Sequence, residues 1–333
     1  MPETARASAP TRVDLAGGTL DLWPLCHLLE APAMTVNVAL ALRAEATVTA
    51  RDDGIVEIRS VDLGQTVQCD VDRLKHDRLG LATRLVEALA PNRSLTVTLR
   101  SGVPRQSGLG GSSALSVALG AALLRFTGRE VDAEHYLRFI QNFETRLLGL
   151  PTGYQDYYPP LFGGAMALEA TFDGVVRHAL DGGPAFLREH LLLADTRLDH
   201  ESGMNNWEVL RGFLDGEFEV RASLNRINQC AYRMRAAVEA CDLHAAARAL
   251  DDEWTARRTL APIVSNERIE ALIAAAKDAG ALAGKVCGAG GGGCIVFFVS
   301  PGSRADVTAA IEAEDGAVLE FEPATEGLSF EDG

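Results

Sequence analysis

A glycine- and serine-rich stretch at residues 104–114, P-R-Q-S-G-L-G-G-S-S-A, runs directly into a segment, residues 112–126, that is apolar on nearly every side. A helix of this kind belongs in a domain interior, because no face of it suits water. Burying it requires layers of secondary structure on several sides. With 333 residues and 47% hydrophobic side chains the chain can form such a core, and its length suggests about two compact units.

Alternation of apolar and β-branched residues predicts strands in the first half of the chain. They lie at residues 12–15, 33–50, 56–61 and 95–99, followed by a hairpin over residues 162–178 that turns at Asp173-Gly174. Apolar residues recur at helical spacing over residues 73–89 and 132–148. Glu144 falls on the apolar stripe of the second of these helices.

The second half of the chain begins with a strand and continues with long helical patterns. The remaining predicted elements are a helix, a strand, a glycine turn, a strand, a helix and a strand, an order that suggests an α+β sandwich of ferredoxin-like type. Proline and paired glycine at residues 182–184 predict a boundary between an N-terminal unit (residues 1–183) and a C-terminal unit (residues 184–333). We expect the acidic residues 322–333 to be a frayed, solvated tail.

Charge and cysteine content exclude several classes of protein. The formal net charge is −15 at pH 7, and such a field repels nucleic acid and anionic membranes. The six cysteines contain no C-x-x-C pair and signal no zinc site. The first ten residues lack the apolar core of a signal peptide, and no run approaches the roughly 18 apolar residues of a membrane span. We expect a cytoplasmic protein with no nucleic-acid or membrane partner.

The stretch at residues 104–114 suits a phosphate group. Its glycines let the backbone fold closely around an anion, and the N-terminus of the helix that follows adds partial positive charge. Ser112 and Ser113 carry hydroxyls that can bind phosphate oxygens or a magnesium ion. A flexible loop capped by serine is an equally good interpretation. No Gly-Lys-Ser/Thr appears, so the stretch is not a Walker A loop.

A second glycine cluster lies in residues 285–297, K-V-C-G-A-G-G-G-G-C-I-V-F. Gly288, Gly290 and Gly293 match the letters of a dinucleotide fingerprint, but a strand follows where such a site needs a helix. Five glycines in the six positions 288–293 indicate backbone pressed against another surface. That surface is either a ligand or a packed neighbour.

Two acids, Glu144 and Asp156, are separated by a proline- and glycine-containing turn. A carboxylate on an apolar helix stripe is costly unless it is paired or bound to a cation. Metal coordination would compensate Glu144, and so would a salt bridge to a neighbouring arginine. Asp156 suits catalysis, but a helix N-cap or a solvated loop acid is also possible at such a turn.

The N-terminal segment R-V-D-L-A-G-G-T-L-D contains further polar candidates. Arg12 and Asp14 share one face of a strand, where they can pair with each other or serve a site. Asp21 lies past a turn made by Gly17 and Gly18. Its carboxylate can accept hydrogen bonds from vicinal hydroxyls of a ligand, or satisfy its own backbone as turn aspartates do.

Taken in order, these stretches resemble motifs of the GHMP kinases. They are R-V-D-L-A-G-G-T-L-D-L (residues 12–22), G-L-G-G-S-S-A (108–114), T-G-Y-Q-D (152–156) and G-A-G-G-G-G (288–293). The first is most similar to the sugar branch of the family, and the resemblance spans about residues 10–300. It implies a two-domain α+β fold. The N-terminal domain would be like domain 2 of ribosomal protein S5, the C-terminal domain ferredoxin-like, and the active site would lie between them.

The resemblance also implies roles for individual residues. Asp156 would be the catalytic base, with Arg12 near the transferred phosphate to keep that base ionised. The substrate-binding residues would be Asp21, Gly17, Gly18 and Tyr157, of which Tyr157 stands where the sugar branch usually has glutamine. The ATP-binding residues would be Pro104, Gly108, Leu109, Gly110, Gly111, Ser112, Ser113, Gly290 and Gly291. Ser113 and Glu144 would hold magnesium.

The activity implied by the resemblance is transfer of the γ-phosphate of ATP, with Mg²⁺, to a sugar hydroxyl. The sugar branch implies the anomeric hydroxyl of a hexose or heptose, including a heptose 7-phosphate. Two alternatives stay open. One is a GHMP enzyme that acts on a non-sugar alcohol such as mevalonate, and the other is a non-catalytic sensor of sugar and nucleotide. We expect a monomer or a homodimer.

Overall fold

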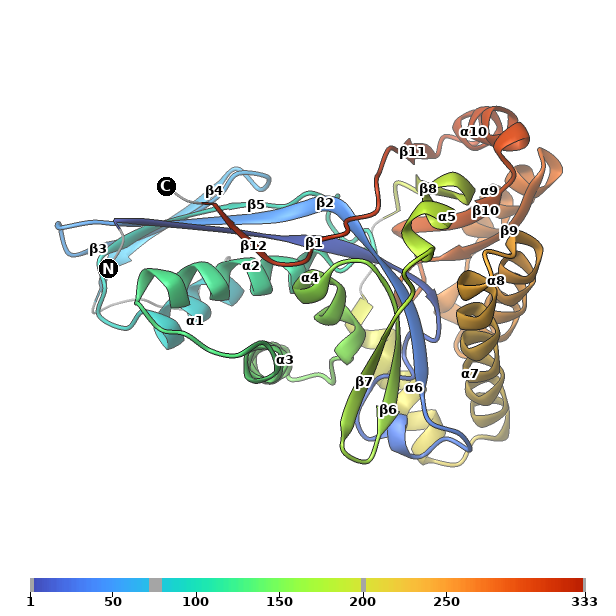
Figure 1. Cartoon of the computed structure of the whole chain (residues 1–333), viewed down its shortest axis with the longest axis horizontal. Helices are drawn as coiled ribbons and strands as arrows, with labels where there is room; N and C mark the ends of the chain where they lie inside the picture. Colours follow the sequence, from blue (N-terminus) through green and yellow to red (C-terminus); the bar gives the residue numbers. More distant parts are fainter. Residues whose placement is uncertain (1–2, 72–79, 199–201, 332–333) are drawn as a thin grey trace.

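The computed structural model of the chain describes residues 3–71, 80–198 and 202–331. Within these residues the chain forms an eight-stranded sheet and a four-stranded sheet. Figure 1 shows the larger sheet along the top of the molecule with the first helices beneath it, and the smaller sheet with the last helices at the right. The α+β class predicted from the sequence is therefore confirmed.

The larger sheet has the strand order β12-β1-β2-β5-β3-β4, and β6 pairs with both β2 and β7. Its strands are β1 (Thr4–Ala16), β2 (Met34–Ala50), β3 (Ile55–Ser60), β4 (Gln65–Asp70), β5 (Leu95–Arg100), β6 (Ala165–Thr171), β7 (Gly174–Ala179) and β12 (Ser329–Glu331). The helices beneath it are α1 (Gly80–Leu89), α2 (Gly111–Phe126), α3 (Ala133–Leu148) and α4 (Tyr158–Phe162). The predicted helix over residues 73–89 is helical from Gly80, and its earlier residues lie outside the described part.

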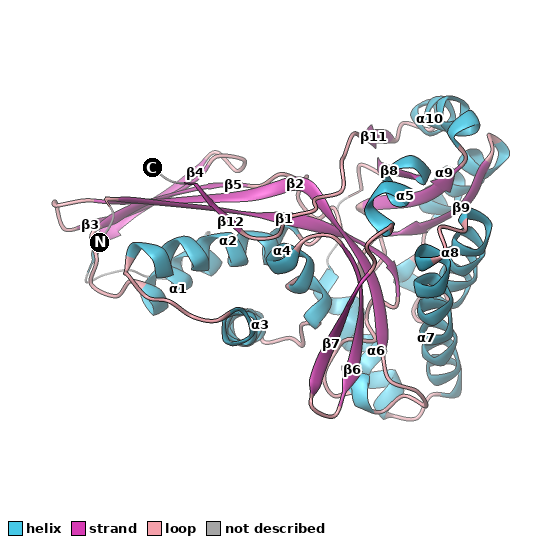
Figure 2. Cartoon of the chain, viewed as in Figure 1, coloured by secondary structure: helices cyan, strands magenta, loops and turns pink. Residues whose placement is uncertain are grey.

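The smaller sheet has the order β11-β8-β10-β9. Its strands are β8 (Leu191–Asp195), β9 (Ala281–Val286), β10 (Cys294–Val299) and β11 (Ala317–Leu319). The accompanying helices are α5 (Gly183–His190), α6 (Ser202–Leu214), α7 (Phe218–Glu239), α8 (Leu243–Arg257), α9 (Glu267–Asp278) and α10 (Arg304–Ala313). Helix α7 contacts β1 and β2 of the larger sheet and α8 contacts β9 of the smaller one, so this helix pair joins the two sheets (Figure 2). No helix in the described part of the chain is long and apolar enough to cross a membrane.

Helix α2 is buried as its sequence predicts. It packs on β1 and β2 and is surrounded by α1, α3 and α4. Its buried residues include Ala114, Ala118, Ala122 and Leu123, each 0% exposed. The small side chains on this helix let the sheet and the neighbouring helices approach it closely, so the start of α2 is held rigidly against β1.

Strand β1 changes character along its length. Its first residues alternate between buried and accessible, whereas every residue from Ala9 to Ala16 is buried. The reason is that the second half of β1 has α2 and α4 against it and also contacts α7 and α8 of the C-terminal part. Polar side chains on this half of the strand are therefore placed between the two parts of the molecule.

The prediction of a frayed acidic tail is wrong for the described residues 322–331. Strand β12 pairs with the edge of β1, where Ser329 lies opposite Ser8. The N–H of Ala324 donates to the carbonyl oxygen of Ala39 at 2.8 Å, and Arg43 donates to the carbonyl oxygen of Gly327 at 2.6 Å. The edge of β1 offers unpaired backbone groups that the tail satisfies.

We still propose the division into residues 1–183 and 184–333. Strand β12 follows the second unit in the sequence but pairs with the sheet of the first.

Candidate active site

Arg12, in the buried half of β1, joins three parts of the chain. Its Nε donates to Oδ1 of Asp156 at 2.8 Å, and a second guanidinium nitrogen donates to the carbonyl oxygen of Gly108. Its backbone N–H donates to the carbonyl oxygen of Leu109 at 2.9 Å. The structure thus brings Arg12 and Asp156 together at the glycine-serine loop, although 144 positions separate them in the sequence.

Asp156 is the accessible member of this ion pair. Its side chain is 29% exposed, whereas the side chain of Arg12 is only 5% exposed. Asp156 ends the short helix η3 (Tyr154–Asp156), and α4 begins after Tyr157 with no side-chain cap. The interpretation of Asp156 as an N-cap is therefore excluded. An accessible carboxylate anchored by a buried cation is well placed to meet a ligand.

The glycine-serine loop (residues 104–114) ends at the N-terminus of α2. Gly110 precedes the helix with a left-handed φ of 72° and has no side chain with which to cap it. The positive φ favours glycine here, and a Cβ would lie in tight contact with the side chain of Arg12, 3.2 Å from its Cγ. The first-turn amides of α2 point along the helix axis, where an anion is stabilised by the helix dipole.

The second glycine loop (residues 288–293) packs against the first one. The N–H of Cys294 donates to the carbonyl oxygen of Ser107 at 2.8 Å. A Cβ at Gly293 would lie 2.6 Å from the carbonyl oxygen of Gln106, and one at Gly288 would lie 3.3 Å from Gly108. The sequence left open whether these glycines contact a ligand or another part of the protein. Gly288 and Gly293 contact another part of the protein, which is the glycine-serine loop.

Gly290 and Gly291, predicted to contact ATP, lie against the segment that contains Val264. The N–H of Gly291 already donates to the carbonyl oxygen of Val264 at 2.8 Å. A Cβ at Gly290 would lie 2.6 Å from the same oxygen. Both glycines therefore let the loop approach η4 (Pro262–Val264), and the Gly291 N–H is not available to a phosphate.

Glu144 is buried in a group of hydroxyls at the start of α2. Its carboxylate accepts from Oγ of Ser112 and Ser113, each at 3.2 Å, and from the hydroxyl of Tyr157 at 2.9 Å. Burial raises the pKa of Glu144, and the hydroxyl donors oppose that rise only in part. Among the described residues no arginine or lysine forms an ion pair with it, so the salt-bridge interpretation is not supported.

Tyr157, predicted to contact the substrate, lies buried beside Glu144. The side chain is 1% exposed and its hydroxyl donates to Oε2 of Glu144. An aromatic hydroxyl that is buried must find a partner inside the protein, and here the partner is a carboxylate. We therefore place Tyr157 beside Glu144, and its contact with the substrate stays a prediction.

Asp21 is held against the segment that carries Asp156. One oxygen of its carboxylate accepts from the N–H of Gln155 at 2.9 Å, and the absence of a side chain at Gly153 allows this approach, because a Cβ there would overlap the carboxylate. The carboxylate therefore accepts both from a distant segment and from its own backbone, as turn aspartates do. Burial, with the charge of Asp156 as the second cause, raises the pKa of Asp21 to about 7.

The raised pKa of Asp21 predicts a pH-dependent stability. In the folded protein Asp21 keeps its proton up to about pH 7, whereas in the unfolded chain it loses the proton near the ordinary aspartate value of 3.8. The unfolded state thus binds fewer protons between these values, and the contribution of Asp21 to the free energy of unfolding falls as pH rises through that window. Asp21→Asn, which cannot titrate, should gain stability relative to wild type as pH rises from about 4 to about 7. Urea unfolding of both proteins would measure this, and parallel pH profiles would contradict it.

Four charged side chains form a buried ion network that sequence reasoning missed. Nζ of Lys285 lies 3.0 Å from Oδ2 of Asp14 and 3.2 Å from Oε1 of Glu253. Arg257 pairs with the same oxygen of Glu253 at 2.6 Å. All four are at most 1% exposed. Asp14 pairs with Lys285, which excludes the simplest sequence interpretation, a pair with Arg12. A lysine inside the apolar run at residues 281–286 is the signal that sequence reasoning could have used.

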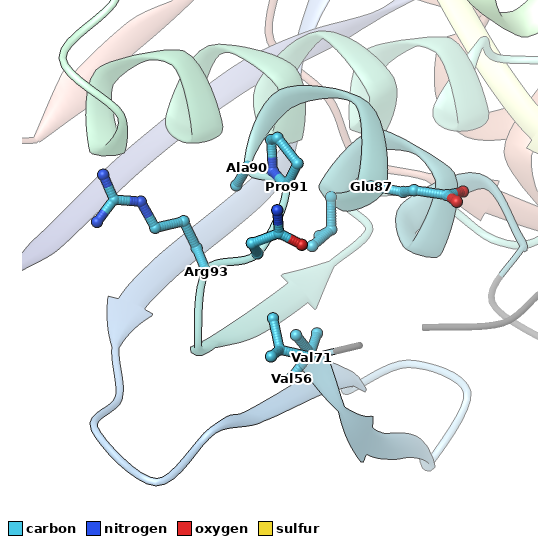
Figure 3. Close-up of a pocket in the computed structure, with 8 residues that line it drawn as sticks. Val56, Val71, Glu87, Ala90, Pro91 and Arg93 are labelled. Carbon is cyan, nitrogen blue, oxygen red and sulfur yellow. The ribbon is translucent and has the colours of Figure 1, made fainter. Parts of the chain in front are cut away.

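A surface pocket elsewhere in the molecule takes no part in this site. It is lined by residues of β3, of α1 and of the turn after α1, and by Val71 just past β4; Val56, Glu87 and Pro91 are among them (Figure 3). Arg129, just past the C-terminal end of α2, donates to the carbonyl oxygen of Leu89 at 2.6 Å, so the turn after α1 lies at that end of α2. The loop at the other end of this 16-residue helix is about 24 Å away.

Comparison with known proteins identifies the family. The family model of the GHMP kinases N terminal domain matches residues 78–164, and that of the GHMP kinases C terminal domain matches residues 234–317. A D-glycero-alpha-D-manno-heptose 7-phosphate kinase of Campylobacter jejuni is 28% identical, with 98% of each chain covered. A mevalonate kinase of Thermococcus sibiricus is 24% identical, also with 98% of each covered. The crystal structure of a D-glycero-D-manno-heptose 1-phosphate kinase of Bacteroides thetaiotaomicron superposes with a TM-score of 0.79 at 23% identity over 99% of each chain, a likeness of fold alone.

The chain belongs to the GHMP kinases, and the two matched regions contain the two glycine loops. It is an ATP-dependent phosphotransferase. The predicted resemblance to the sugar branch is confirmed, because the heptose 7-phosphate kinase, at 28% identity, is more similar over the same 98% of the chain than the mevalonate kinase, at 24%.

Proposed function

We propose that this kinase transfers the γ-phosphate of ATP to a hydroxyl of a hexose or heptose, and that the acceptor is the anomeric hydroxyl. The observation that carries the proposal is the accessible carboxylate of Asp156, paired with Arg12 at the glycine-serine loop and next to Asp21. The loop suits the phosphates of ATP, and Asp21 suits sugar hydroxyls. The name of the Campylobacter jejuni relative supports a heptose phosphate as the first acceptor to test.

In the proposed mechanism Asp156 accepts the proton of the acceptor hydroxyl. The hydroxyl oxygen then forms its bond to the γ-phosphorus as the bond from that phosphorus to the β-phosphate oxygen breaks, leaving ADP. Arg12 holds the carboxylate of Asp156 in place through two donors and also contacts the loop at Gly108. The amides at the start of α2 stabilise charge on the phosphates.

The residues around Glu144 fit a magnesium ion. A buried carboxylate that meets only hydroxyls lacks a compensating cation, and Mg²⁺ would supply one. Magnesium is usually held by one or two carboxylates together with substrate phosphates, which is the kind of site that Glu144 and the neighbouring serines could form. Glu144 and Ser113 would hold it, with Ser112 as the second serine. When bound, it neutralises charge on the β- and γ-phosphates.

Glu144→Gln should raise the magnesium concentration that gives half-maximal activity by about tenfold, because the amide oxygen can still accept from Ser113 and Tyr157 but the side chain carries no charge. A magnesium titration of ADP release at saturating ATP would measure this. Glu134→Gln, on an accessible part of α3, is the matched control. An unchanged magnesium dependence in the Glu144 variant would mean that Glu144 is only a structural acceptor.

The decisive experiment for the proposed function is a screen of free and phosphorylated sugars for ADP release, with NMR of the product to locate the new phosphate. Mevalonate belongs in the same screen, because the Thermococcus sibiricus mevalonate kinase also matches along nearly the whole chain. Turnover of mevalonate and of no sugar would overturn the proposal. Binding of sugar and ATP without any ADP release would indicate a sensor.

A further inference from the structure

The buried ion network is connected to the turn that precedes Asp21. Nη2 of Arg257 donates to the carbonyl oxygen of Gly18 at 2.7 Å, and Nη1 lies 3.4 Å from Oγ1 of Thr19. Arg257 ends α8, whereas Gly18 and Thr19 follow β1, so these bonds cross from one part of the molecule to the other. Arg257 thus links the network directly to the turn.

The backbone of this turn is strained at Thr19. Its φ of 77° lies in the left-handed region, which a β-branched residue adopts only as a genuine outlier. Such a conformation persists when surrounding contacts hold it. Two contacts do so here: Arg257 holds the turn from one side, and Oγ1 of Thr19 donates to Oδ1 of Asn206 at 3.0 Å on the other.

Stability alone does not explain why four charges are buried here. Oδ1 of Asp14 and Oε2 of Glu253 are buried without a hydrogen-bond partner in the described part of the chain. Replacing a buried ion cluster by well-packed apolar residues is often neutral or stabilising. A network with two unsatisfied oxygens is therefore better explained by the geometry that it imposes than by the energy that it contributes.

We propose that Arg257 is a positioning residue for the phosphate acceptor. It holds the strained Gly18–Thr19 turn so that Asp21, two residues later, stays between the Gly153–Gln155 segment and the acceptor. This inference rests on the proposed function, because it takes Asp21 as the acceptor-binding carboxylate. It predicts an effect on the acceptor and not on ATP, since the hydrogen bonds and ion pairs of Arg257 within the described residues go to the turn and to Glu253.

The main test removes a cation and its partner anion together. In Arg257→Met/Glu253→Gln the pair between Lys285 and Asp14 remains balanced, so the variant should fold. We expect the KM for the acceptor sugar to rise by about 10- to 100-fold while the KM for ATP stays within about twofold. Arg258→Met, on the same end of α8 with an exposed partner in Glu270, is the control and should match wild type. Equal rises in both KM values would overturn the proposal.

Relief of the strain provides a second test. Glycine adopts positive φ without steric cost. In a Thr19→Gly background the turn is therefore unstrained and keeps its conformation without the contact from Arg257. The rise in acceptor KM caused by Arg257→Met/Glu253→Gln should then be at least about threefold smaller than in the Thr19 background. An identical rise in both backgrounds would contradict the role assigned to Arg257.

A third measurement does not depend on sugar phosphorylation. The N–H groups of Leu20 and Leu22 donate to the carbonyl oxygens of Gly17 and Thr19 at 3.1 and 3.3 Å, so hydrogen exchange reports whether the turn is formed. Exchange of these amides should be faster in Arg257→Met/Glu253→Gln than in Arg258→Met. Unchanged exchange would overturn the inference. A wild-type enzyme that phosphorylates no sugar would instead overturn the proposed function, and this exchange result would still decide the role of Arg257 in the turn.

Discussion

Asp156→Asn should reduce turnover by about 10²- to 10⁴-fold, because the amide cannot accept the proton of the acceptor hydroxyl. ATP affinity should stay near its wild-type value, since the glycine-serine loop and the first turn of α2 are unchanged. The amide oxygen can still accept from Nε of Arg12, which limits any displacement of the buried guanidinium.

Single-turnover kinetics and a separate ATP titration would measure the two quantities independently. Asp173→Asn, in the exposed turn between β6 and β7, is a matched control for replacing one acid by its amide. Wild-type turnover in Asp156→Asn would eliminate Asp156 as the base. Loss of ATP binding together with turnover would indicate that its main role is to hold Arg12 and the loop.

Lys285→Met should lower the free energy of unfolding by about 3–5 kcal/mol at neutral pH, because it leaves the carboxylates of Asp14 and Glu253 buried with one cation fewer between them. Burial favours the neutral form of Asp14, but Lys285 and Arg257 outweigh it and lower the pKa of Asp14. The stability that this lowered pKa confers is present at neutral pH and is lost as pH falls. The difference between variant and wild type should therefore shrink in acid.

Urea unfolding at neutral and acidic pH would measure this loss. Lys277→Met is the control, because Lys277 pairs with Asp251 on the surface and exposed ion pairs contribute roughly 0–1 kcal/mol. A loss for Lys285→Met no larger than for Lys277→Met would mean that the network relaxes around the missing cation. A loss that does not change with pH would mean that Asp14 stays ionised without Lys285.

Local patterns predict most of the elements around the site. The all-apolar segment forms α2, and Glu144 lies buried on the stripe where helical spacing places it. The predicted β6–β7 hairpin also forms, but it turns at Phe172-Asp173, because Gly174 already pairs with Thr171. Each of these depends on residues a few positions apart. The failures involve distant partners: local composition predicts a frayed tail, and the tail instead pairs with β1 about 320 residues earlier in the chain.

The site itself shows the same division. Local spacing predicts a glycine loop before a helix N-terminus, and the family resemblance implies that Glu144 and Asp156 lie near this loop and that Arg12 acts on Asp156. The pairs of Asp14 with Lys285 and of Tyr157 with Glu144 became visible only in the folded structure, which also brings Arg12 to Asp156. A buried charge takes whichever partner the packing of strands and helices brings within about 3 Å, and residue type and spacing carry no record of that choice.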